Sequence, residues 1–142
     1  PGGKTTLTQG LTSVVLHNTM AQNTRERNNK RLVNVIMEAT KNGRAVTMIG
    51  TIRASKALRE GIKLRLADLY DYTIPTEALT AMEGDGLFVI GRPGGHCQLD
   101  ASIVPPGGMI DNRVSRIQCF ARRVADRFVI FDCSINGTKL VC

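Results

Sequence analysis

The stretch from Val114 to Thr138 constrains the fold more than any other part of the chain. It contains two runs in which apolar and polar residues partly alternate and β-branched or aromatic residues gather, Ile117–Phe120 and Arg127–Phe131. Polar residues adjoin both runs: Ser115-Arg116 precedes the first, and the segment 132–138 follows the second. This pattern predicts an antiparallel β unit whose ends carry small hydrogen-bonding residues and a cation.

A third strand-like run, Leu87–Ile90, lies upstream and ends at Gly91-Arg92. If the three runs share one sheet, the polar groups at their ends meet at one edge of it. Those groups are Arg92, Ser115-Arg116 and Asn136-Gly137-Thr138. Arginine and hydroxyl groups on separate loops can surround a phosphate, because a phosphate dianion offers three strong acceptor oxygens. The three segments therefore predict an anion-binding pocket.

Length and composition limit the classes of protein to which this chain can belong. A chain of 142 residues predicts one domain, or a small domain with an appendage. No apolar run approaches the roughly 20 residues that cross a bilayer, and no secretory signal is present. The chain begins with a proline, so we expect a processed product or an excised segment of an intracellular protein, cytoplasmic or alternatively nuclear.

The four cysteines, at positions 97, 119, 133 and 142, form no CxxC pair. In the absence of a secretory signal we expect them to be reduced. Cys119 lies inside a strand-like run, where a small buried hydrophobe is expected. A zinc site built from His96-Cys97, Cys119 and Cys133 would match no closed tetrahedral spacing. We therefore expect neither a metal nor another cofactor.

Positive charge is concentrated in the first half of the chain. Residues 25–66 contain eleven Lys or Arg against three Glu, whereas residues 67–142 contain seven basic and nine acidic residues. Turn-forming and breaker residues gather over 72–86. We therefore predict a basic mixed α/β segment over 1–72, either a helical extension or part of the β structure, and a β-rich domain over 73–142.

Apolar residues at helical spacing predict a helix over Thr24–Lys41 that ends at Asn42-Gly43. Alternating residues before the same Asn-Gly pair leave a hairpin as the alternative. A β-rich strand is expected over Ala45–Ile52. Upstream of the helix we expect a mobile terminus over Pro1–Gly10 and a polar loop over Asn18–Asn29.

The segment Ser55–Tyr70 predicts an amphipathic helix with a basic outer surface, although Gly61 is a poor helix former. Its apolar residues recur every three or four positions. A turn is expected over Tyr70–Pro75 and a helical turn over Pro75–Met82. The Pro-Pro-Gly-Gly segment at 105–108 predicts the exposed tip of a long loop.

The three motifs, taken in order, resemble those of the forkhead-associated (FHA) domain. Phe88–Arg92 matches its Gly-Arg, Val114–Arg116 matches the start of its Ser-Arg-x-His, and Phe128–Thr138 matches its Asp-x-Ser-x-Asn-Gly-Thr. The likeness covers about the last third of the chain. FHA domains are β-sandwiches whose loops bind phosphothreonine peptides. The resemblance thus implies a mainly β protein: an FHA-like β-sandwich in the C-terminal part, preceded by a basic segment that contains an α-helix.

The resemblance also implies a role for each residue of the motifs. Arg92 would contact the phosphate, Ser115 would donate a hydroxyl hydrogen bond to it, and Arg116 would add a second cation. Asn136 would hold the main chain of the peptide. Gln118 stands where the family has a histidine that braces the loops. The residues expected to shape the loops are Gly91, Gln118, Gly137 and Thr138.

The sequence departs from the family pattern near its end as well. It stops soon after Asn-Gly-Thr, where an FHA domain has several more strands. We expect the first eighty residues to supply the missing strands in a rearranged order, with a truncated domain or a fold that is only FHA-like as alternatives.

We therefore expect a protein-interaction module that binds phosphothreonine in a protein or peptide and has no catalytic activity. No nucleophile and base are paired in the motifs. One alternative is an FHA-like scaffold that forms homo-oligomers without binding phosphate. The other is nucleic-acid binding through the basic first half, although aromatic residues, at 4%, are too few for a stacking platform for single strands.

Overall fold

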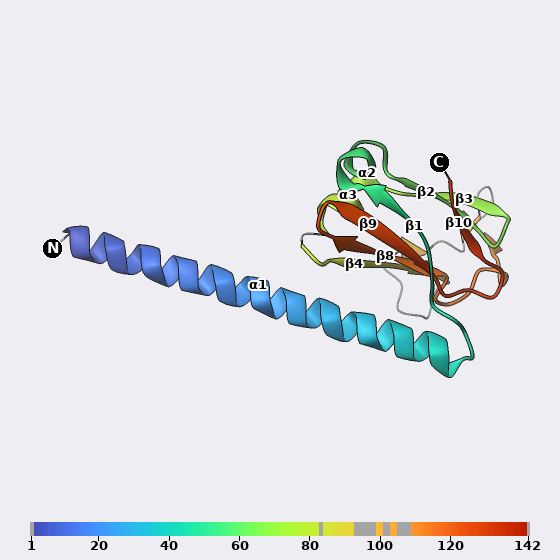
Figure 1. The fold of residues 1–142 in the computed structure, drawn as a ribbon, viewed down its shortest axis with the longest axis horizontal. Helices are drawn as coiled ribbons and strands as arrows, with labels where there is room; N and C mark the ends of the chain where they lie inside the picture. Colours follow the sequence, from blue (N-terminus) through green and yellow to red (C-terminus); the bar gives the residue numbers. More distant parts are fainter. Residues whose placement is uncertain (1, 83, 93–98, 101–102, 105–108, 142) are drawn as a thin grey trace.

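A long helix and a compact β domain make up the structure. The computed structural model describes residues 2–82, 84–92, 99–100, 103–104 and 109–141. Helix α1, Gly2–Lys41, is 40 residues long, which corresponds to about 60 Å at 1.5 Å per residue. Its C-terminal end lies beside the β domain, and its N-terminal end extends far from it (Figure 1).

The end of α1 was predicted correctly. The backbone N–H groups of Gly43 and Arg44 donate to the carbonyl oxygens of Thr40 and Ala39, which is the Schellman arrangement that closes a helix. Gly43 has a φ of 74°, a conformation that glycine adopts without strain. The hairpin alternative is wrong for this segment, and the helix confirms the prediction over residues 24–41.

The helix begins much earlier than predicted. The expected loop over Asn18–Asn29 is wrong, because these residues belong to α1. Residues 2–10 of the segment expected to be mobile are also helical, and Pro1 lies outside the described residues. A helix satisfies its backbone hydrogen bonds internally, so a polar stretch can remain helical without burying a face in a core.

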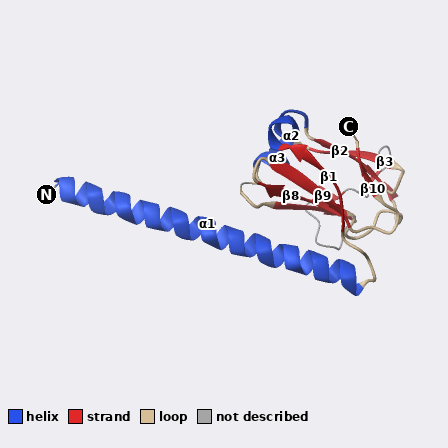
Figure 2. Ribbon diagram, in the orientation of Figure 1, coloured by secondary structure: helices blue, strands red, loops and turns tan. Residues whose placement is uncertain are grey.

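Ten strands follow in the described part of the β domain. Five of them, in the spatial order β1-β9-β8-β4-β5, form the larger sheet, and three form a second sheet in the order β10-β2-β3 (Figure 2). β4 and β5 are parallel, whereas every other neighbouring pair is antiparallel. The strands of the larger sheet are β1 (Thr47–Arg53), β4 (Leu87–Gly91), β5 (Leu99–Asp100), β8 (Cys119–Val124) and β9 (Arg127–Asp132). Those of the second sheet are β2 (Ile62–Leu66), β3 (Tyr70–Ile74) and β10 (Thr138–Leu140).

The remaining elements are short. Helices α2, Ala54–Glu60, and α3, Thr76–Thr80, connect strands, and α3 confirms the helical turn expected over Pro75–Met82. Strands β6, Ile103–Val104, and β7, Met109–Ile110, pair with each other as a separate ribbon. The Pro-Pro-Gly-Gly tip at 105–108 lies outside the described residues. The strand expected over Ala45–Ile52 is confirmed by β1, and the predicted antiparallel pair in 114–138 by β8 and β9.

The amphipathic helix predicted over Ser55–Tyr70 is wrong beyond its first half, and so is the turn predicted over Tyr70–Pro75. α2 stops at Gly61, whose φ is 77° and whose Cα faces the carbonyl oxygen of Ile74; an added Cβ would lie 2.6 Å from that oxygen. The chain then forms the β2–β3 hairpin. Ile62 and Leu66 fit both a helical and a two-residue period, and burial of Leu64 between them follows the two-residue period of a strand.

Both faces of the larger sheet are covered. One face packs on the second sheet and on α2 and α3, and the shared core includes Ile62, Leu64, Phe88, Phe128 and Ile130. The other face packs on the C-terminal part of α1 through a second apolar cluster. That cluster includes Val35, Ala39, Leu87, Val89, Ile117, Phe120 and Cys133. The structure is therefore mixed α/β, with two antiparallel-rich sheets around one core and a helix on the outer face.

The two ranges predicted from the charge distribution, 1–72 and 73–142, both contribute strands to these sheets. β1 pairs with β9, and β2 pairs with β10, so residues 47–72 are integrated with residues 73–142. Only α1 extends from this common β structure (Figure 1).

Candidate functional site

The end of β4 lies directly against the segment that precedes β8. The backbone N–H of Arg92 donates to the carbonyl oxygen of Ser115 at 3.0 Å. A Cβ added to Gly91 would lie only 2.0 Å from the carbonyl oxygen of Arg116. Glycine is therefore required at position 91 for this close approach, which brings the Gly-Arg and Ser-Arg motifs into contact.

Gln118 joins the two loops of the motifs from inside the protein. Its side chain is fully buried. Oε1 accepts the backbone N–H of Ser115 at 2.9 Å, while Nε2 donates to the carbonyl oxygen of Gly137 at 2.7 Å and to Oγ1 of Thr138 at 3.0 Å. Its backbone N–H also donates to Ile90 at 2.9 Å. The side-chain amide thus joins the two loops, because glutamine offers a donor and an acceptor at once, and the backbone N–H of the same residue connects them to β4.

The loop after β9 is fixed by a network of short-range hydrogen bonds. Oδ1 of Asp132 accepts from the Ser134 hydroxyl at 2.6 Å, from the Ser134 backbone N–H at 3.2 Å and from the Thr138 hydroxyl at 2.8 Å. The Ser134 hydroxyl in turn accepts the backbone N–H of Gly137 at 2.8 Å. Gly137 has a φ of 90°, which favours glycine. The Asp-x-Ser-x-Asn-Gly-Thr motif is thus a self-bracing turn.

Two further hydrogen bonds connect this loop to the Ser-Arg segment. Oγ of Ser115 accepts the backbone N–H of Ile135 at 3.2 Å, and Nδ2 of Asn136 donates to the carbonyl oxygen of Arg113 at 2.9 Å. A serine hydroxyl that accepts one bond still has its proton to donate. Ser115 therefore links the loops while keeping a donor for a ligand.

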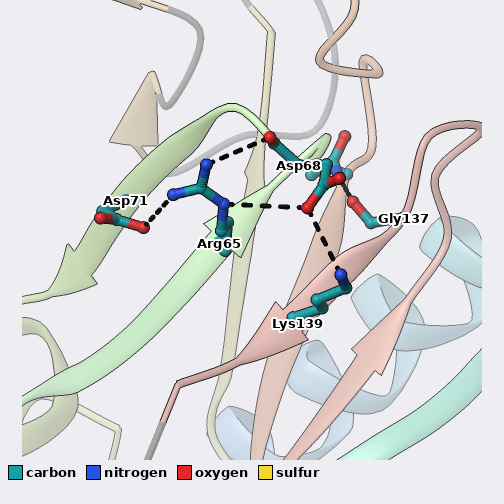
Figure 3. A network of polar contacts seen from close by, with 6 residues as sticks. Arg65, Asp68, Asp71, Gly137 and Lys139 are labelled. Carbon is teal, nitrogen blue, oxygen red and sulfur yellow. Dashed lines mark hydrogen bonds and ion pairs between the residues drawn. The ribbon is translucent and has the colours of Figure 1, made fainter.

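The carbonyl oxygen of Gly137 also anchors the turn between β2 and β3, because it accepts the backbone N–H of Ala67 at 2.9 Å. Ion pairs surround this turn on the protein surface (Figure 3). Their side chains are 41–77% exposed, so each pair stabilises the fold by about 1 kcal/mol at most. The ion pairs join Arg65 to Asp68 and Asp71, and Lys139 to Asp68.

A second anchor holds the start of the Ser-Arg segment. The carboxylate of Asp111 accepts hydrogen bonds from the Arg113 guanidinium, at 2.6 Å from Nη2, and from the hydroxyl of Tyr70 on β3. The bonds from Arg113, and then the bond from Tyr70, hold the pKa of Asp111 well below the usual range of aspartate. The hydrogen bond to Asp111 raises the pKa of the Tyr70 phenol.

These loops and the end of α1 enclose a cavity of about 470 Å³. Arg92, Ser115 and Arg116 all line it, so three of the four residues expected to bind a phosphopeptide share one hollow. The fourth, Asn136, is exposed beside the cavity and holds Arg113. The other lining residues are Glu38, Ala39, Asn42, Arg44, Asn112, Ile117, Cys133 and Ile135.

The charge of the cavity is positive. Three arginines, Arg44, Arg92 and Arg116, line it with one carboxylate, Glu38. Nη1 of Arg92 donates to Oδ1 of Asn112 at 3.2 Å, which orients the guanidinium. Arg92 and Arg44 are half-buried, and a guanidinium in such a position interacts with an anion more strongly than one in bulk water. The arrangement is therefore suited to an oxyanion.

Arg44 was missed by the sequence motifs. Arg44 lies three residues after the end of α1. It is part of the Schellman turn, where the chain leaves the helix and continues to β1. The packing of Val35 and Ala39 on the larger sheet, together with the hydrogen bond from Nη1 of Arg31 to the carbonyl oxygen of Leu87 at 3.0 Å, brings the end of α1 to the cavity. The basic excess of residues 25–66 is the one sequence signal that included Arg44, and it gave no position for it.

Two of the four cysteines, Cys119 and Cys133, are described, and both are buried free thiols. Cys119 is fully buried, as expected from its strand-like run. Cys133 lines the cavity, and burial, followed by the charge of Asp132, raises the pKa of its thiol to about 12. His96 and Cys97 lie outside the described residues. Among the residues that are described, no three His, Cys, Asp or Glu side chains gather as a metal site would require.

Comparisons with protein-family models, with curated proteins and with solved structures give no match to this chain. In the part of the chain that the structure describes, no helix is both long and apolar enough to span a bilayer. The chemistry of the cavity is therefore the basis for a functional assignment.

Proposed function

We propose that this chain is a phosphopeptide-binding module that recognises phosphothreonine, built on an FHA-like β-sandwich, and that it is not an enzyme. The observation that carries the proposal is the convergence of Arg92, Ser115 and Arg116 on one positively charged cavity. These residues lie on two separate segments of the chain, Arg92 on one and Ser115-Arg116 on the other, and they are the ones that the FHA resemblance assigns to the phosphate.

The proposed roles follow from the donors around the cavity. The guanidinium groups of Arg92 and Arg116 pair with phosphate oxygens, and the Ser115 hydroxyl donates to a third oxygen. Hydrogen bonds to charged groups contribute roughly 1.5–3 kcal/mol each before the costs of association. Arg44, which also lines the cavity, adds a third cation. Asn136, which is exposed, holds the peptide main chain through its side-chain carbonyl oxygen and its second amide N–H, because one N–H already donates to Arg113.

Among the described residues that line the cavity, the nucleophile types Glu38, Ser115 and Cys133 are not hydrogen-bonded to a base. Cys133 is the one thiol that lines it, and a pKa of about 12 keeps this thiol protonated at neutral pH. Binding and release of an anion, without bond breaking, is the chemistry that the lining residues favour.

A pair of peptide libraries tests the proposal. One library carries a fixed phosphothreonine with randomised flanks, and the other carries unphosphorylated threonine at the same position. We expect retention of the phosphorylated library alone. Equal retention of both would remove the phosphate from the recognition and leave an FHA-like scaffold as the better description.

Substitutions then locate the site with a peptide selected from the library. Arg92→Ala should weaken binding about 30-fold, because it removes a charge-assisted pair worth about 2 kcal/mol. Arg44→Ala should also weaken it, by a smaller factor. The matched control is Arg59→Ala, which removes the same charge from an exposed position on α2, away from the cavity. Equal effects of Arg92→Ala and Arg59→Ala would contradict the assignment.

A further inference from the structure

Two arginines lie directly opposite each other at the end of the larger sheet that the phosphate cavity does not use. In the antiparallel ladder of β1 and β9, Arg53 is the register partner of Arg127. Side chains at such positions project from the same face with Cβ atoms roughly 5 Å apart, and like charges there are destabilising. The free protein therefore holds two cations in an unfavourable arrangement.

No acidic side chain neutralises this pair in the described part of the chain. Both arginines are exposed, and none of the ion pairs between described residues involves either of them. Nη1 of Arg127 donates to the hydroxyl of Thr51, two residues before Arg53 on the same face, at 3.2 Å. The Arg127 guanidinium is thus held on this face beside Arg53.

Two further arginines lie at this end of the sheet, and we define the basic patch as Arg53, Arg122, Arg123 and Arg127. Arg122 shares the face of Arg53 and Arg127, because it is the register partner of Val129 and Val129 is that of Thr51. Arg123 is the register partner of Phe128, so it projects from the face of the sheet opposite to the other three. Arg53, Arg123 and Arg127 line a second cavity, of about 520 Å³, with Asp126 as its one carboxylate. None of its lining residues belongs to the first cavity.

Two contacts hold the Arg123 side chain in place at the end of the sheet. Its guanidinium lies over the ring of Phe128, 5.4 Å from the ring centroid, and Nε donates to the carbonyl oxygen of Ala125 at 3.3 Å. Phe128 itself is fully buried, so its ring cannot stack on a base. The patch therefore offers cations and no aromatic platform, which excludes the usual recognition of unstacked single strands.

We propose that the basic patch binds the phosphodiester backbone of duplex nucleic acid, independently of sequence and of the phosphate cavity. A duplex presents closely spaced phosphates, and Arg53, Arg127 and Arg122 share one face of three adjacent strands, β1, β9 and β8. A membrane surface fits less well, because binding there combines charge with inserted apolar side chains. Val124, 48% exposed, is the one large apolar side chain on the β8–β9 hairpin that the structure shows as exposed.

Salt-dependent binding to a short DNA duplex of mixed sequence tests this proposal. The variant is Arg53→Gln with Arg127→Gln, which keeps the aliphatic stems of both side chains. We expect at least tenfold weaker binding at low salt. The slope of log K against log salt should become shallower by about 2, because each phosphate contact contributes about 0.9. The thermal midpoint should stay unchanged or rise, since a like-charge pair is removed.

The control is Arg65→Gln with Lys139→Gln, which removes the same charge from the second sheet, where both side chains are paired with Asp68. It should leave duplex binding nearly unchanged. Phosphopeptide binding should be unaffected by the Arg53 and Arg127 substitutions, so this test is separate from that of the first cavity. Equal losses in the two double variants, no duplex binding by the unmodified protein at low salt, or binding to anionic vesicles that duplex does not compete for would each overturn the proposal.

Discussion

The side-chain amide of Gln118 donates to the backbone carbonyl of Gly137 at 2.7 Å, across 19 residues of sequence. This bond is one of three that the buried Gln118 side chain makes, and together they hold the Ser-Arg segment beside the Asn-Gly-Thr loop. The shape of the cavity proposed to bind phosphate therefore depends on a residue that does not line it.

Gln118→Ala should lower the free energy of unfolding by about 3 kcal/mol, because it leaves the Ser115 N–H without its acceptor and opens a small void. Chemical denaturation measures this directly. Gln22→Ala, on the exposed surface of α1, is the control and should change stability by less than about 0.5 kcal/mol. A loss at Gln118 no larger than the loss at Gln22 would show that the loops do not need this brace.

Gly91→Ala should be more damaging than an ordinary glycine substitution. The new Cβ would lie 2.0 Å from the carbonyl oxygen of Arg116, so β4 and the Ser-Arg segment must separate. We expect a cost of about 3 kcal/mol or more, together with loss of phosphopeptide binding. Gly43→Ala is the comparison: its Cβ would meet nothing within 4 Å, and only its φ of 74° opposes it, at about 1 kcal/mol. Similar costs at the two positions would contradict the close approach.

The residues of the candidate site were found from sequence because their motifs end neighbouring strands. β4, β8 and β9 are adjacent in the larger sheet, so Gly91-Arg92 and Ser115-Arg116 meet as expected. The position of Arg44 at the cavity could not be predicted from the motifs, since it depends on the packing of α1 on the sheet. The hairpin of β2 and β3 was missed for a local reason: Ile62 and Leu66 are four residues apart, a spacing that strands and helices share.

The stability of the loop anchored by Asp111 should depend on pH in the acid range. Hydrogen bonds from Arg113, and then from Tyr70, depress the pKa of this carboxyl in the folded state. The contribution of the Asp111 carboxylate to folding stability is therefore complete above the ordinary aspartate pKa of about 4, and it is lost as the pH falls below that value. Thermal unfolding followed from neutral pH to pH of about 2 should show Asp111→Asn less stable at neutral pH and the two proteins converging in acid. A difference that stays constant with pH would contradict this anchor.

Docking of α1 is the last requirement for a complete cavity, since Glu38, Ala39 and Asn42 form one of its walls. Val35 is fully buried in the cluster between α1 and the larger sheet, whereas Val33 is 53% exposed on the same helix. Val35→Ala should cost about 2 kcal/mol, and Val33→Ala less than about 0.5 kcal/mol.

The same pair of variants separates packing from ligand binding. If the wall formed by α1 contributes to the site, Val35→Ala should also weaken binding of a phosphothreonine peptide, because α1 undocks more often, and Val33→Ala should leave it unchanged. Calorimetric titration of the folded variants measures both effects. Destabilisation by Val35→Ala with undiminished peptide affinity would place the phosphate contacts entirely on the loops of the β domain, and Arg44 would then have no part in binding.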